Sequence, residues 1–447
     1  MEPERIFKRK IYDRLLKWKR ESNGKTALLV EGARRIGKST IVEEFARKEY
    51  ESYILIDFTK CSQEVKDLFN DVSDLNYIFL RLQLIYGVRL VERKSLIIFD
   101  EVQFQPLARQ AIKSFVENNK YDYIETGSLI SIRKNTRDIL IPSEEKRISM
   151  YPMDYEEFRW ALGDSATIPL LRSVWEHPQP LGQAHRKLMR DFRLYMLVGG
   201  MPQAVNAYLD SNNFEVVDEA KRLILDLYDE DFGKIDPAGK AARIFAAIPA
   251  QLNSNASRYQ ISNVIPKARA EDYIELISEM EKSRTVNISH HCDDPNVGFG
   301  STEDLTQYKM FAGDTGLFVT LAFRDKAFTE NIIYQHLLSD KLATNLGYLY
   351  ENVVAQMLTA SGNNLFYHAW PTESRKHNYE IDFLLSRGTK IMPIEIKSSS
   401  YKTHASMDAF CAKYHSRITN DRYLIYTKDY AKEGAMRYLP AYLAFFL

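Results

Sequence analysis

Apolar runs and helical periodicities alternate through the first third of the chain. Four short runs rich in Ile, Leu, Val and Tyr are typical of buried strands in a parallel sheet. These strands are expected at residues 27–30, 53–58, 96–99 and 121–125. Residues 40–48 and a longer stretch that ends near Gly87 have the spacing of helices. Because strands that alternate with helices form βαβ units, the pattern predicts an α/β fold with a parallel sheet.

Helical periodicity dominates the middle of the chain. Residues 156–231 are expected to form helices whose Tyr and Phe side chains belong to the core, with a break at the Gly-Gly-Met-Pro cluster of residues 199–202. Residues 241–289 then suggest three short helices followed by a strand, the order of a winged helix-turn-helix. The third of these helices begins with acidic residues, which disfavours contact with DNA phosphates. Two interpretations stay open for this segment, DNA contact and docking onto another domain or a protein partner.

The last part of the chain predicts a helix followed by two adjacent strands. The helix is expected at about residues 346–360, and the strands at 379–385 and 391–397. Because side chains alternate between the two faces of a strand, Glu395 and Lys397 are expected on one face of the second strand.

The loop after the first strand carries the most specific motif in the chain. Residues 32–39 read Gly-Ala-Arg-Arg-Ile-Gly-Lys-Ser and fit G-x-x-x-x-G-K-[ST] between a strand and a helix. In that geometry backbone N–H groups and the helix N-terminus surround a triphosphate, Lys38 reaches its β- and γ-phosphates, and the Ser39 hydroxyl holds Mg²⁺. The predicted nucleotide-binding residues are Gly32, Ala33, Arg34, Arg35, Ile36, Gly37, Lys38, Ser39 and Thr40. An ordinary glycine turn before a helix is the alternative.

Polar residues follow two other expected strands. Asp100 and Glu101 come directly after the apolar run 96–99, at the edge of the sheet where parallel sheets bind ligands. Asp100 is expected to hold Mg²⁺ through water, and Glu101 to polarise the attacking water. Thr126 and Ser128 follow the next strand and are predicted to sense the γ-phosphate or the water. A solvated strand end and a simple turn are the alternatives at these two places.

Composition and charge narrow the interpretation only slightly. At 447 residues the chain is long enough for two or three domains. Lys+Arg and Asp+Glu both number 60, so a nucleic-acid partner would require a local basic patch. The three cysteines are far apart in the sequence and are interpreted as free thiols of a reducing compartment. No apolar run approaches the roughly 20 residues of a membrane span, so a cytoplasmic location without a membrane partner is expected.

These motifs resemble those of a family of bacterial and archaeal AAA-type P-loop ATPases with an uncharacterised C-terminal domain that contains a restriction-endonuclease-like core. The resemblance covers nearly the whole chain, and its further marks lie at residues 99–103, 126–128, 151–158, 198–202 and 314–317. It implies that the nucleotide is ATP. Family members commonly have Gly-Arg where this chain has Lys146 and Arg147. The arginine of that pair is kept, so Arg147 remains a candidate sensor of γ-phosphate charge, with a plain surface arginine as the alternative.

The C-terminal strand pair resembles the PD-(D/E)-x-K motif of nucleases through Asp382, Glu395 and Lys397. Phosphodiester hydrolysis in such a site needs carboxylates that hold Mg²⁺ and a lysine that positions or activates water. Glu351 would complete the metal ligands, which are then Glu351, Asp382 and Glu395. The predicted catalytic residues of the chain are Lys38, Glu101, Asp382, Glu395 and Lys397. An inactive binding module and a strand pair with a solvated polar face are the alternatives.

We therefore expect three domains: an ATPase domain at residues 1–160, a helical region at 161–330 with the winged helix at 241–289, and a nuclease-like α/β domain at 331–447. The expected function is an ATPase that uses ATP and Mg²⁺ and controls the nuclease-like domain, with DNA as its substrate. The alternative is an ATP-gated switch or binding protein for DNA or a protein partner, with an inactive C-terminal domain. The sequence leaves the oligomeric state open.

Overall fold

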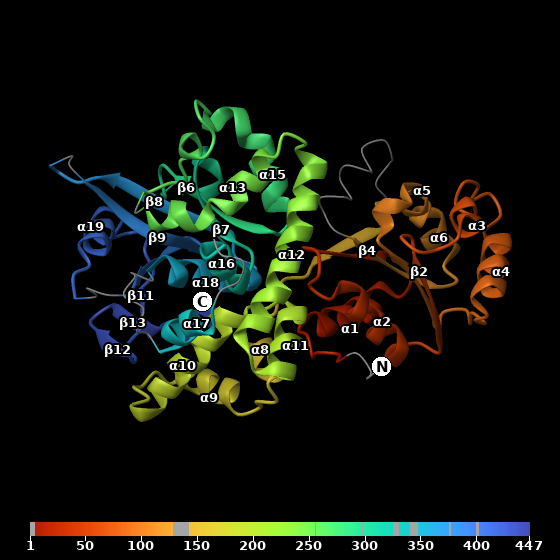
Figure 1. Ribbon diagram of the computed structural model, residues 1–447, viewed down its shortest axis with the longest axis horizontal. Coiled ribbons are helices and arrows are strands. Elements are labelled where there is room, and N and C mark those ends of the chain that lie inside the picture. Colours follow the sequence, from red (N-terminus) through yellow and green to blue (C-terminus); the bar gives the residue numbers. More distant parts are fainter. Residues whose placement is uncertain are drawn as a thin grey trace. The chain divides into compact units, whose positions relative to one another are not determined.

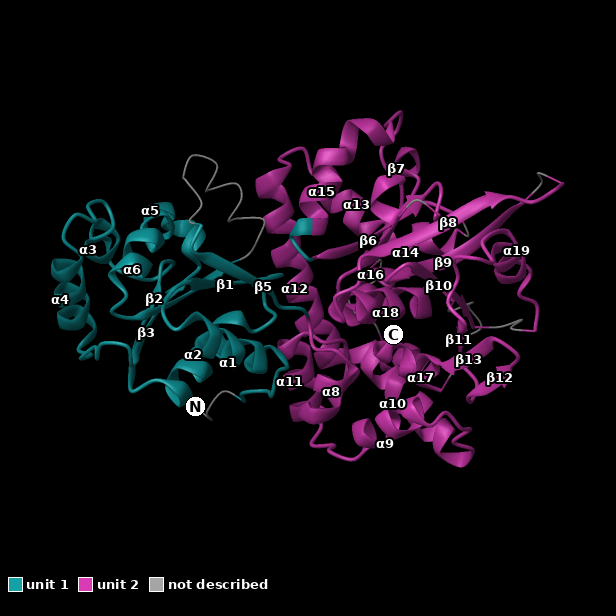
Figure 2. Cartoon of the chain, turned by 180° about the vertical axis from the view of Figure 1, so that it is seen from behind, with its two compact units in different colours: residues 1–151, 282–284 teal, residues 152–281, 285–447 magenta. Residues whose placement is uncertain are grey.

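The computed structural model of the protein describes residues 5–127, 143–254, 256–296, 298–324, 330–339, 347–374, 377–398 and 402–447. The chain divides into two compact units, which Figure 2 shows in different colours. Unit 1 comprises residues 1–151 and 282–284, and unit 2 comprises residues 152–281 and 285–447. Unit 1 ends before the boundary expected at residue 160. The reason is that the next segment belongs to unit 2, where the N–H of Met153 donates to the carbonyl of Gly200 at 2.7 Å.

A five-stranded sheet forms the centre of unit 1 (Figure 1). Its strands are β1 (Ala27–Glu31), β2 (Ser52–Asp57), β3 (Ser95–Asp100), β4 (Asp122–Gly127) and β5 (Glu145–Ser149). They lie in the order β2-β3-β4-β1-β5, and every neighbouring pair is parallel. Both β3 and β4 are buried along their whole length, and β3 accordingly carries a continuous apolar run without alternation. The predicted α/β fold with a parallel sheet is confirmed for this unit.

Aromatic side chains fill the core on one side of this sheet. Phe99 of β3 lies 5.6 Å from Phe69 and 5.9 Å from Phe115, measured between ring centroids. Phe115 also packs against Tyr123 of β4 at 5.4 Å. Burial of these large rings fixes β3 and β4 relative to each other.

The described helices of unit 1 are α1 (Ile11–Ser22), α2 (Lys38–Glu49), α3 (Gln63–Asp67), α4 (Leu75–Tyr86), η1 (Val102–Phe104), α5 (Pro106–Gln110) and α6 (Ile112–Asn118).

Unit 2 contains a mixed sheet of eight strands in the order β12-β13-β11-β10-β9-β8-β6-β7. The strands are β6 (Val286–Cys292), β7 (Glu303–Ala312), β8 (Leu365–Pro371), β9 (Asn378–Arg387), β10 (Lys390–Lys397), β11 (Arg422–Tyr426), β12 (Ala431–Glu433) and β13 (Met436–Pro440). The pair β9–β10 is the antiparallel hairpin that the sequence predicts. Its turn contains Gly388, whose φ of 64° favours glycine.

The sheet of unit 2 crosses the domain boundary that the sequence placed after residue 330. Strands β6 and β7 pair with each other, and β6 also pairs with β8, so that segments 286–312 and 365–440 share one sheet. The same pairing bears on the winged-helix prediction for 241–289. A wing is a free hairpin, whereas β6 is an interior strand with partners on both sides. In the described part of this segment the strand therefore lies inside the larger sheet, and the winged helix stays a prediction.

Helices make up most of the remainder of unit 2. They are α8 (Tyr155–Ala161), α9 (Thr167–Glu176), α10 (Gln183–Val198), α11 (Pro202–Ser211), α12 (Phe214–Ile235), α13 (Lys240–Ala246), α14 (Ile248–Asn253), η2 (Ile261–Asn263), η3 (Ala270–Tyr273), α15 (Ile274–Lys282), η4 (Phe299–Ser301), α16 (Thr315–Ala322), α17 (Asn331–Leu338), α18 (Gly347–Ala360), α19 (Ala405–Lys413) and η5 (Ala441–Phe446). Among the described residues, no helix is both long and apolar enough to span a membrane.

Three of the motifs that mark the family resemblance meet at one packing junction in unit 2. The carboxylate of Asp314, at the start of α16, accepts the N–H of Gly200 at 2.6 Å. A Cβ on Gly316 would lie 2.5 Å from the carbonyl oxygen of Val198, and one on Gly200 would lie 2.1 Å from that of Met153. These segments need glycine because their backbones are in direct contact. The motifs thus have a packing role that their sequences alone did not reveal.

Candidate nucleotide site and carboxylate cluster

The loop between β1 and α2 has the glycines that its backbone requires. A Cβ on Gly32 would lie 2.4 Å from the carbonyl oxygen of Met150, so no larger residue fits there without movement. Gly37 precedes α2 with φ of 92°, in the left-handed region that L side chains rarely adopt. The loop therefore turns directly into the N-terminus of α2, where backbone N–H groups and the helix dipole favour an anion.

The Lys38 ammonium group lies against the loop. Lys38 is only 6% exposed, and its Nζ donates to the carbonyl oxygens of Gly32 at 3.1 Å and Ala33 at 2.8 Å. A second buried cation supports the loop from α1's N-terminal side. Arg9 donates to the carbonyl oxygens of Ile36, at 2.8 Å, and Tyr151. Sequence reasoning missed Arg9 because it lies outside the motif and has no characteristic spacing from it.

Hydroxyl groups from two elements meet on one carboxylate oxygen at the end of β3. The Ser39 hydroxyl donates to Oδ1 of Asp100 at 2.6 Å, and the Thr126 hydroxyl donates to the same oxygen. Strand β4 lies between β1 and β3 in the sheet, which places Thr126 between the loop and Asp100. The structure therefore brings together three of the predicted site residues from different parts of unit 1.

Glu101 is attached to this network through its backbone. Its N–H donates to the Thr126 hydroxyl at 3.3 Å, and its carboxylate accepts a hydrogen bond from the Gln103 side chain. Glu101 has φ of 54°, a conformation uncommon for a residue with a Cβ. Such strain persists where the surrounding structure imposes it, and here it turns the chain immediately after β3.

The donor atoms at this edge of the sheet suit Mg²⁺. Magnesium prefers oxygen ligands and usually combines one or two protein groups with substrate phosphates and water. The Ser39 hydroxyl and the Asp100 carboxylate provide such oxygens side by side. Among the described residues, no group of three or more His, Cys, Asp or Glu side chains is arranged to hold a metal ion, and this applies also to the predicted set of Glu351, Asp382 and Glu395 in unit 2. A metal here would therefore depend on the oxygens of a bound nucleotide.

The proposed sensor Arg147 has a different partner in the structure. Its Nε donates to Glu145 of the same strand at 2.8 Å. Glu145 also accepts two hydrogen bonds from the buried Arg109, at 2.9 and 3.0 Å. Arg147 therefore takes part in an ion-pair network at the edge strand β5. Of the other two proposed sensors, Thr126 contacts Asp100 as described above, and Ser128 lies outside the described residues.

Unit 2 brings the predicted nuclease-like residues close together. The register of the β9–β10 hairpin places Glu395 opposite Asp382, because Ile394 pairs with Phe383. Asp382 also accepts the N–H of Ile396 at 2.8 Å. Glu351, on the neighbouring helix α18, faces the same group of side chains through a shared partner, Lys309. We call Glu351, Glu380, Asp382, Glu395, Lys309 and Lys397 the carboxylate cluster.

Two members of this cluster, Lys309 and Glu380, were missed by sequence reasoning. Lys309, on β7, is 6% exposed, and its Nζ lies 3.6 Å from Glu351, 3.4 Å from Asp382 and in direct contact with Glu380. Burial alone would lower the pKa of Lys309, but the charges of Glu380, Glu351 and Asp382 raise it well above its ordinary value. Lys309 is therefore a permanent cation among three carboxylates.

The second lysine, Lys397, contacts a different carboxylate. Its Nζ lies 3.0 Å from Oε1 of Glu395 and also donates to the carbonyl oxygen of Thr403. Burial raises the pKa of Glu395 to about 7, although the charge of Lys397 opposes the shift. Burial likewise raises the pKa of Glu351 to about 7, against the effect of Lys309. These two carboxyl groups therefore titrate near neutral pH.

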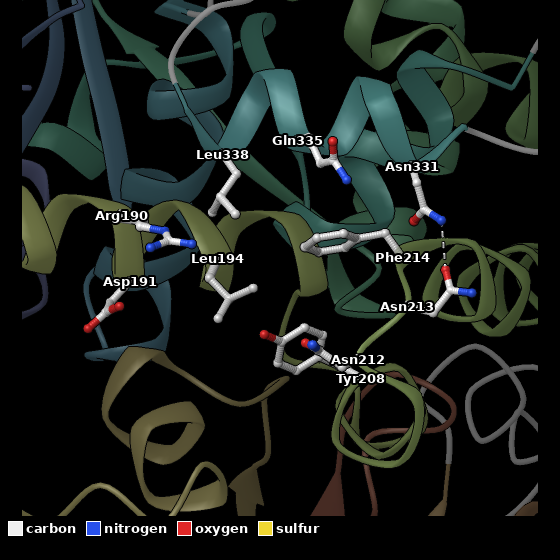
Figure 3. Close-up of a pocket in the computed structure, with 10 residues that line it drawn as sticks. All are labelled: Arg190, Asp191, Leu194, Tyr208, Asn212, Asn213, Phe214, Asn331, Gln335 and Leu338. Atoms are coloured by element: carbon white, nitrogen blue, oxygen red, sulfur yellow. Dashed lines mark hydrogen bonds between the residues drawn. The ribbon is translucent and has the colours of Figure 1, made fainter.

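A separate hollow of about 440 Å³ lies among α10, α11, α17 and the start of α12 (Figure 3). Neutral amides and aromatic rings provide much of its lining, and the Asn331 amide donates to Asn213 at 2.9 Å. Its one carboxylate, Asp191, is engaged by Arg159 at 3.2 Å and Lys187 at 3.0 Å. The hollow thus offers hydrogen bonds and stacking surfaces rather than an acid–base pair.

Comparison with protein families supports the nucleotide site. A family model described as an AAA domain matches residues 24–159, which include the loop, Asp100 and Thr126. Two other family models match residues 189–327 and 346–442, and both are described as domains of unknown function (DUF8612 and DUF4143). The family matches therefore bear on the nucleotide site of unit 1 and assign no chemistry to unit 2.

Individual relatives are distant. The chain is 20% identical to Uncharacterized protein MJ1637 of Methanocaldococcus jannaschii over an alignment of 277 residues, which covers 59% of this chain and 56% of that relative. It is similar to the Walker-type ATPase PABY2304 of Pyrococcus abyssi, with 15% identity, a TM-score of 0.41, and coverage of 71% of this chain and 96% of that one. It is also similar to the RuvB Holliday junction branch migration motor of Thermotoga maritima, with 11% identity, a TM-score of 0.28, and coverage of 65% of this chain and 90% of that one. These scores describe partial likeness, so the assignment rests on the family match. Residues 24–159 are thus similar to AAA domains.

Proposed function

We propose that unit 1 binds ATP together with Mg²⁺ and hydrolyses it to ADP and phosphate. The observation that carries this proposal is the hydrogen-bonded connection from Ser39 through Asp100 and Thr126 to Glu101. It joins the phosphate-binding loop to an acidic residue that is suited to act on water. The AAA family match to this part of the chain supports the same activity.

Binding of the triphosphate follows from the loop and from Lys38. The N–H groups that open α2 donate to phosphate oxygens, and the Lys38 ammonium group exchanges its carbonyl partners for the β- and γ-phosphates. Ser39 and Asp100 hold the magnesium ion, which supplies positive charge that offsets the charge developing on the phosphate oxygens. Arg9 and the close packing at Gly32 hold the loop in place, so binding reorganises mainly the Lys38 side chain.

Hydrolysis requires a base and a fixed position for the attacking water. Glu101 accepts a proton from that water as its oxygen attacks the γ-phosphorus, and the bond to the ADP oxygen breaks. Gln103 donates to the Glu101 carboxylate and limits its movement. Thr126 holds both the Glu101 backbone and Asp100, so the base and the metal ligand keep a constant separation.

The test is phosphate release with Mg²⁺ and ATP, comparing the natural protein with Glu101→Gln. We expect turnover to fall on the order of 10²-fold or more, with the affinity for a fluorescent ATP analogue retained, because the amide cannot accept the proton. Glu117→Gln is the control, since Glu117 lies on α6 and is 62% exposed. Turnover of Glu101→Gln within about twofold of the natural rate would remove Glu101 from the mechanism.

A second function is proposed for the carboxylate cluster, hydrolysis of a phosphodiester, with DNA as the substrate. The observation that favours it is the proximity of Asp382, Glu395 and Lys397 on two paired strands. The experiment incubates DNA with the protein and Mg²⁺, with and without ATP, beside Asp382→Asn. Cleavage that Asp382→Asn abolishes would support a nuclease. Absence of cleavage, with DNA or protein affinity that depends on ATP, would favour the alternative of an ATP-gated binding protein.

A further inference from the structure

The position of Lys309 in the sheet is the starting point. Lys309 lies on the edge strand β7, whereas Glu380 and Asp382 lie on β9, and β6 and β8 separate these strands. The Lys309 side chain reaches across both, with its Nζ 5.8 Å from the centre of the Tyr367 ring on β8. Its partner in the register of β6 is the small residue Ser289, which leaves room for this path. The ammonium group therefore comes to the cluster from an element outside the predicted motif.

The Lys309 ammonium group contacts carboxylates in the way that a bound cation would. An ammonium group has three donors, and Lys309 faces three carboxylates, Glu351, Glu380 and Asp382. A buried charge is stable only when it is paired, so the ammonium group stays where these carboxylates are. On Asp382 it lies against Oδ1, and the N–H of Ile396 occupies Oδ2. Both oxygens of Asp382 are engaged.

The cluster as a whole has less positive charge than negative charge. Four carboxylates face two ammonium groups, so in fully ionised form two negative charges are uncompensated. One carboxylate oxygen shows this shortage of positive charge directly. Among the described residues, Oε2 of Glu395 has no hydrogen-bond partner, although it is buried in a residue that is 7% exposed and opposite Asp382. A buried anionic oxygen without a partner is costly, and a divalent cation would supply the missing charge.

We propose that Lys309 is an internal counter-ion that competes with a divalent cation of the Mg²⁺ or Mn²⁺ class for the carboxylates of unit 2. The ammonium group occupies Asp382, and a metal ion ligated by Asp382 and Glu395 requires that group to move away. Lys309 therefore keeps the affinity of the cluster for divalent cations low. This inference rests on the carboxylate cluster proposed above, and it requires neither phosphodiester cleavage nor ATP hydrolysis.

The first test measures Mn²⁺ affinity in the full chain by calorimetry, without nucleotide. Lys309→Met keeps most of the side-chain volume and removes the charge, and we expect Mn²⁺ to bind roughly tenfold tighter or more. Lys309→Arg retains a charge and is expected to keep the affinity low. Adding Asp382→Asn to Lys309→Met is expected to abolish the gain, which locates the ion in the cluster. Unchanged affinity in folded Lys309→Met would overturn the proposal.

A second measurement uses the natural protein and does not depend on how a variant folds. Lysine side chains are acetylated briefly with and without saturating Mg²⁺, and modification is quantified by mass spectrometry. We expect Mg²⁺ to increase the labelling of Lys309 severalfold, because the ammonium group leaves its carboxylates. The matched control is Lys221, a fully buried lysine that donates to the Leu197 carbonyl and the Tyr334 hydroxyl, each at 2.9 Å. Equal labelling of Lys309 with and without Mg²⁺ would contradict the competition.

The two tests also separate this inference from the proposed functions. Both are performed without nucleotide and without DNA, so loss of ATP turnover or absence of cleavage leaves their readouts unchanged. Tight Mn²⁺ binding that Asp382→Asn abolishes in the presence of natural Lys309 would show a cation site without competition. That result would overturn the role of Lys309 while retaining the metal ligands.

Discussion

The two units each place acidic side chains beside a buried lysine, but the lysine has opposite partners in the two sites. In unit 1 the Lys38 ammonium group donates to backbone carbonyls, and Asp100 is contacted by hydroxyl groups. In unit 2 the Lys309 ammonium group lies directly on carboxylates. A cation that donates to neutral carbonyls can exchange them for an anionic ligand, whereas a cation on carboxylates already has its counter-charge. The first arrangement suits the triphosphate proposed above, and the second is partly neutralised by its own chain.

The origin of the two lysines explains the difference. Lys38 directly follows the loop as the first residue of α2, and the motif itself fixes its separation in sequence from the two glycines. Lys309 is 73 residues away in sequence from Asp382 and arrives through the pairing of β7 with β6. A local motif specifies the binding loop, while the state of the carboxylate cluster depends on the tertiary structure.

The largest expected effect is that of Lys38→Ala on ATP turnover. Removing the charge that is proposed to contact the β- and γ-phosphates is expected to reduce turnover on the order of 10²–10³-fold, as loss of one transition-state donor does. Lys48→Ala, on the same helix, is the control, because Lys48 is 62% exposed and pairs only with Glu44 at 2.7 Å. Phosphate release measures both variants. Similar losses in the two would mean that the Lys38 effect is not specific to the site.

A buried histidine in unit 2 predicts that this unit becomes less stable as the pH falls. His368, on β8, bonds to the carbonyl of Cys292 at 2.7 Å and to the Tyr414 hydroxyl at 3.2 Å, and burial lowers its pKa from 6.5 to about 4. As the pH falls below 6.5 the unfolded chain binds this proton first, so stability is lost between about pH 6.5 and 4. The pKa difference corresponds to about 3 kcal/mol at most.

Urea denaturation of unit 2, followed by hydrogen exchange at pH 7, 5.5 and 4.5, measures this loss. His368→Gln is expected to reduce the pH dependence, whereas His336→Gln, at an exposed position of α17, is expected to retain it. The same dependence on pH in the natural protein and in His368→Gln would show that other groups cause it.

A smaller effect is expected from Thr126→Val, which removes one hydroxyl from the network of unit 1. The valine has nearly the same shape but neither donates to Asp100 nor accepts from the Glu101 N–H. Turnover is expected to fall about tenfold, with Thr126→Ser close to the natural rate, because serine restores the hydroxyl. Titrations of ATP and Mg²⁺ separate changes in binding from changes in turnover. Equal rates for valine and serine would show that the hydroxyl contributes only packing.

Much of unit 1 could be predicted because local sequence determines it. The strands at 27–30 and 96–99 are apolar runs, and the loop glycines have a fixed spacing, so both the parallel sheet and the order of Lys38, Ser39 and Asp100 followed from the sequence. Arg9 was not predictable, because an arginine near the N-terminus has no pattern that indicates a carbonyl partner in the loop.

Unit 2 shows where such reasoning fails. The hairpin of β9 and β10 and the positions of Asp382 and Glu395 follow from strand alternation. The sequence could not show that β6 and β7 extend the same sheet, because strand pairing between distant segments leaves no local signal. Lys309 was missed for that reason, and so was the continuity of unit 2 across residue 330.

The junction of Gly200, Asp314 and Met153 limits how this chain can be divided. A fragment cut after residue 160 keeps Met153 but loses the backbone of Gly200 against which it packs, and a fragment that begins at 331 loses β6, the strand with which β8 pairs. Both cuts leave unsatisfied backbone groups and expose surfaces shaped for another segment. Expression of unit 2 as a separate protein should therefore begin at residue 152, and transplanting the 331–447 segment onto another ATPase should fail unless residues 285–330 are moved with it.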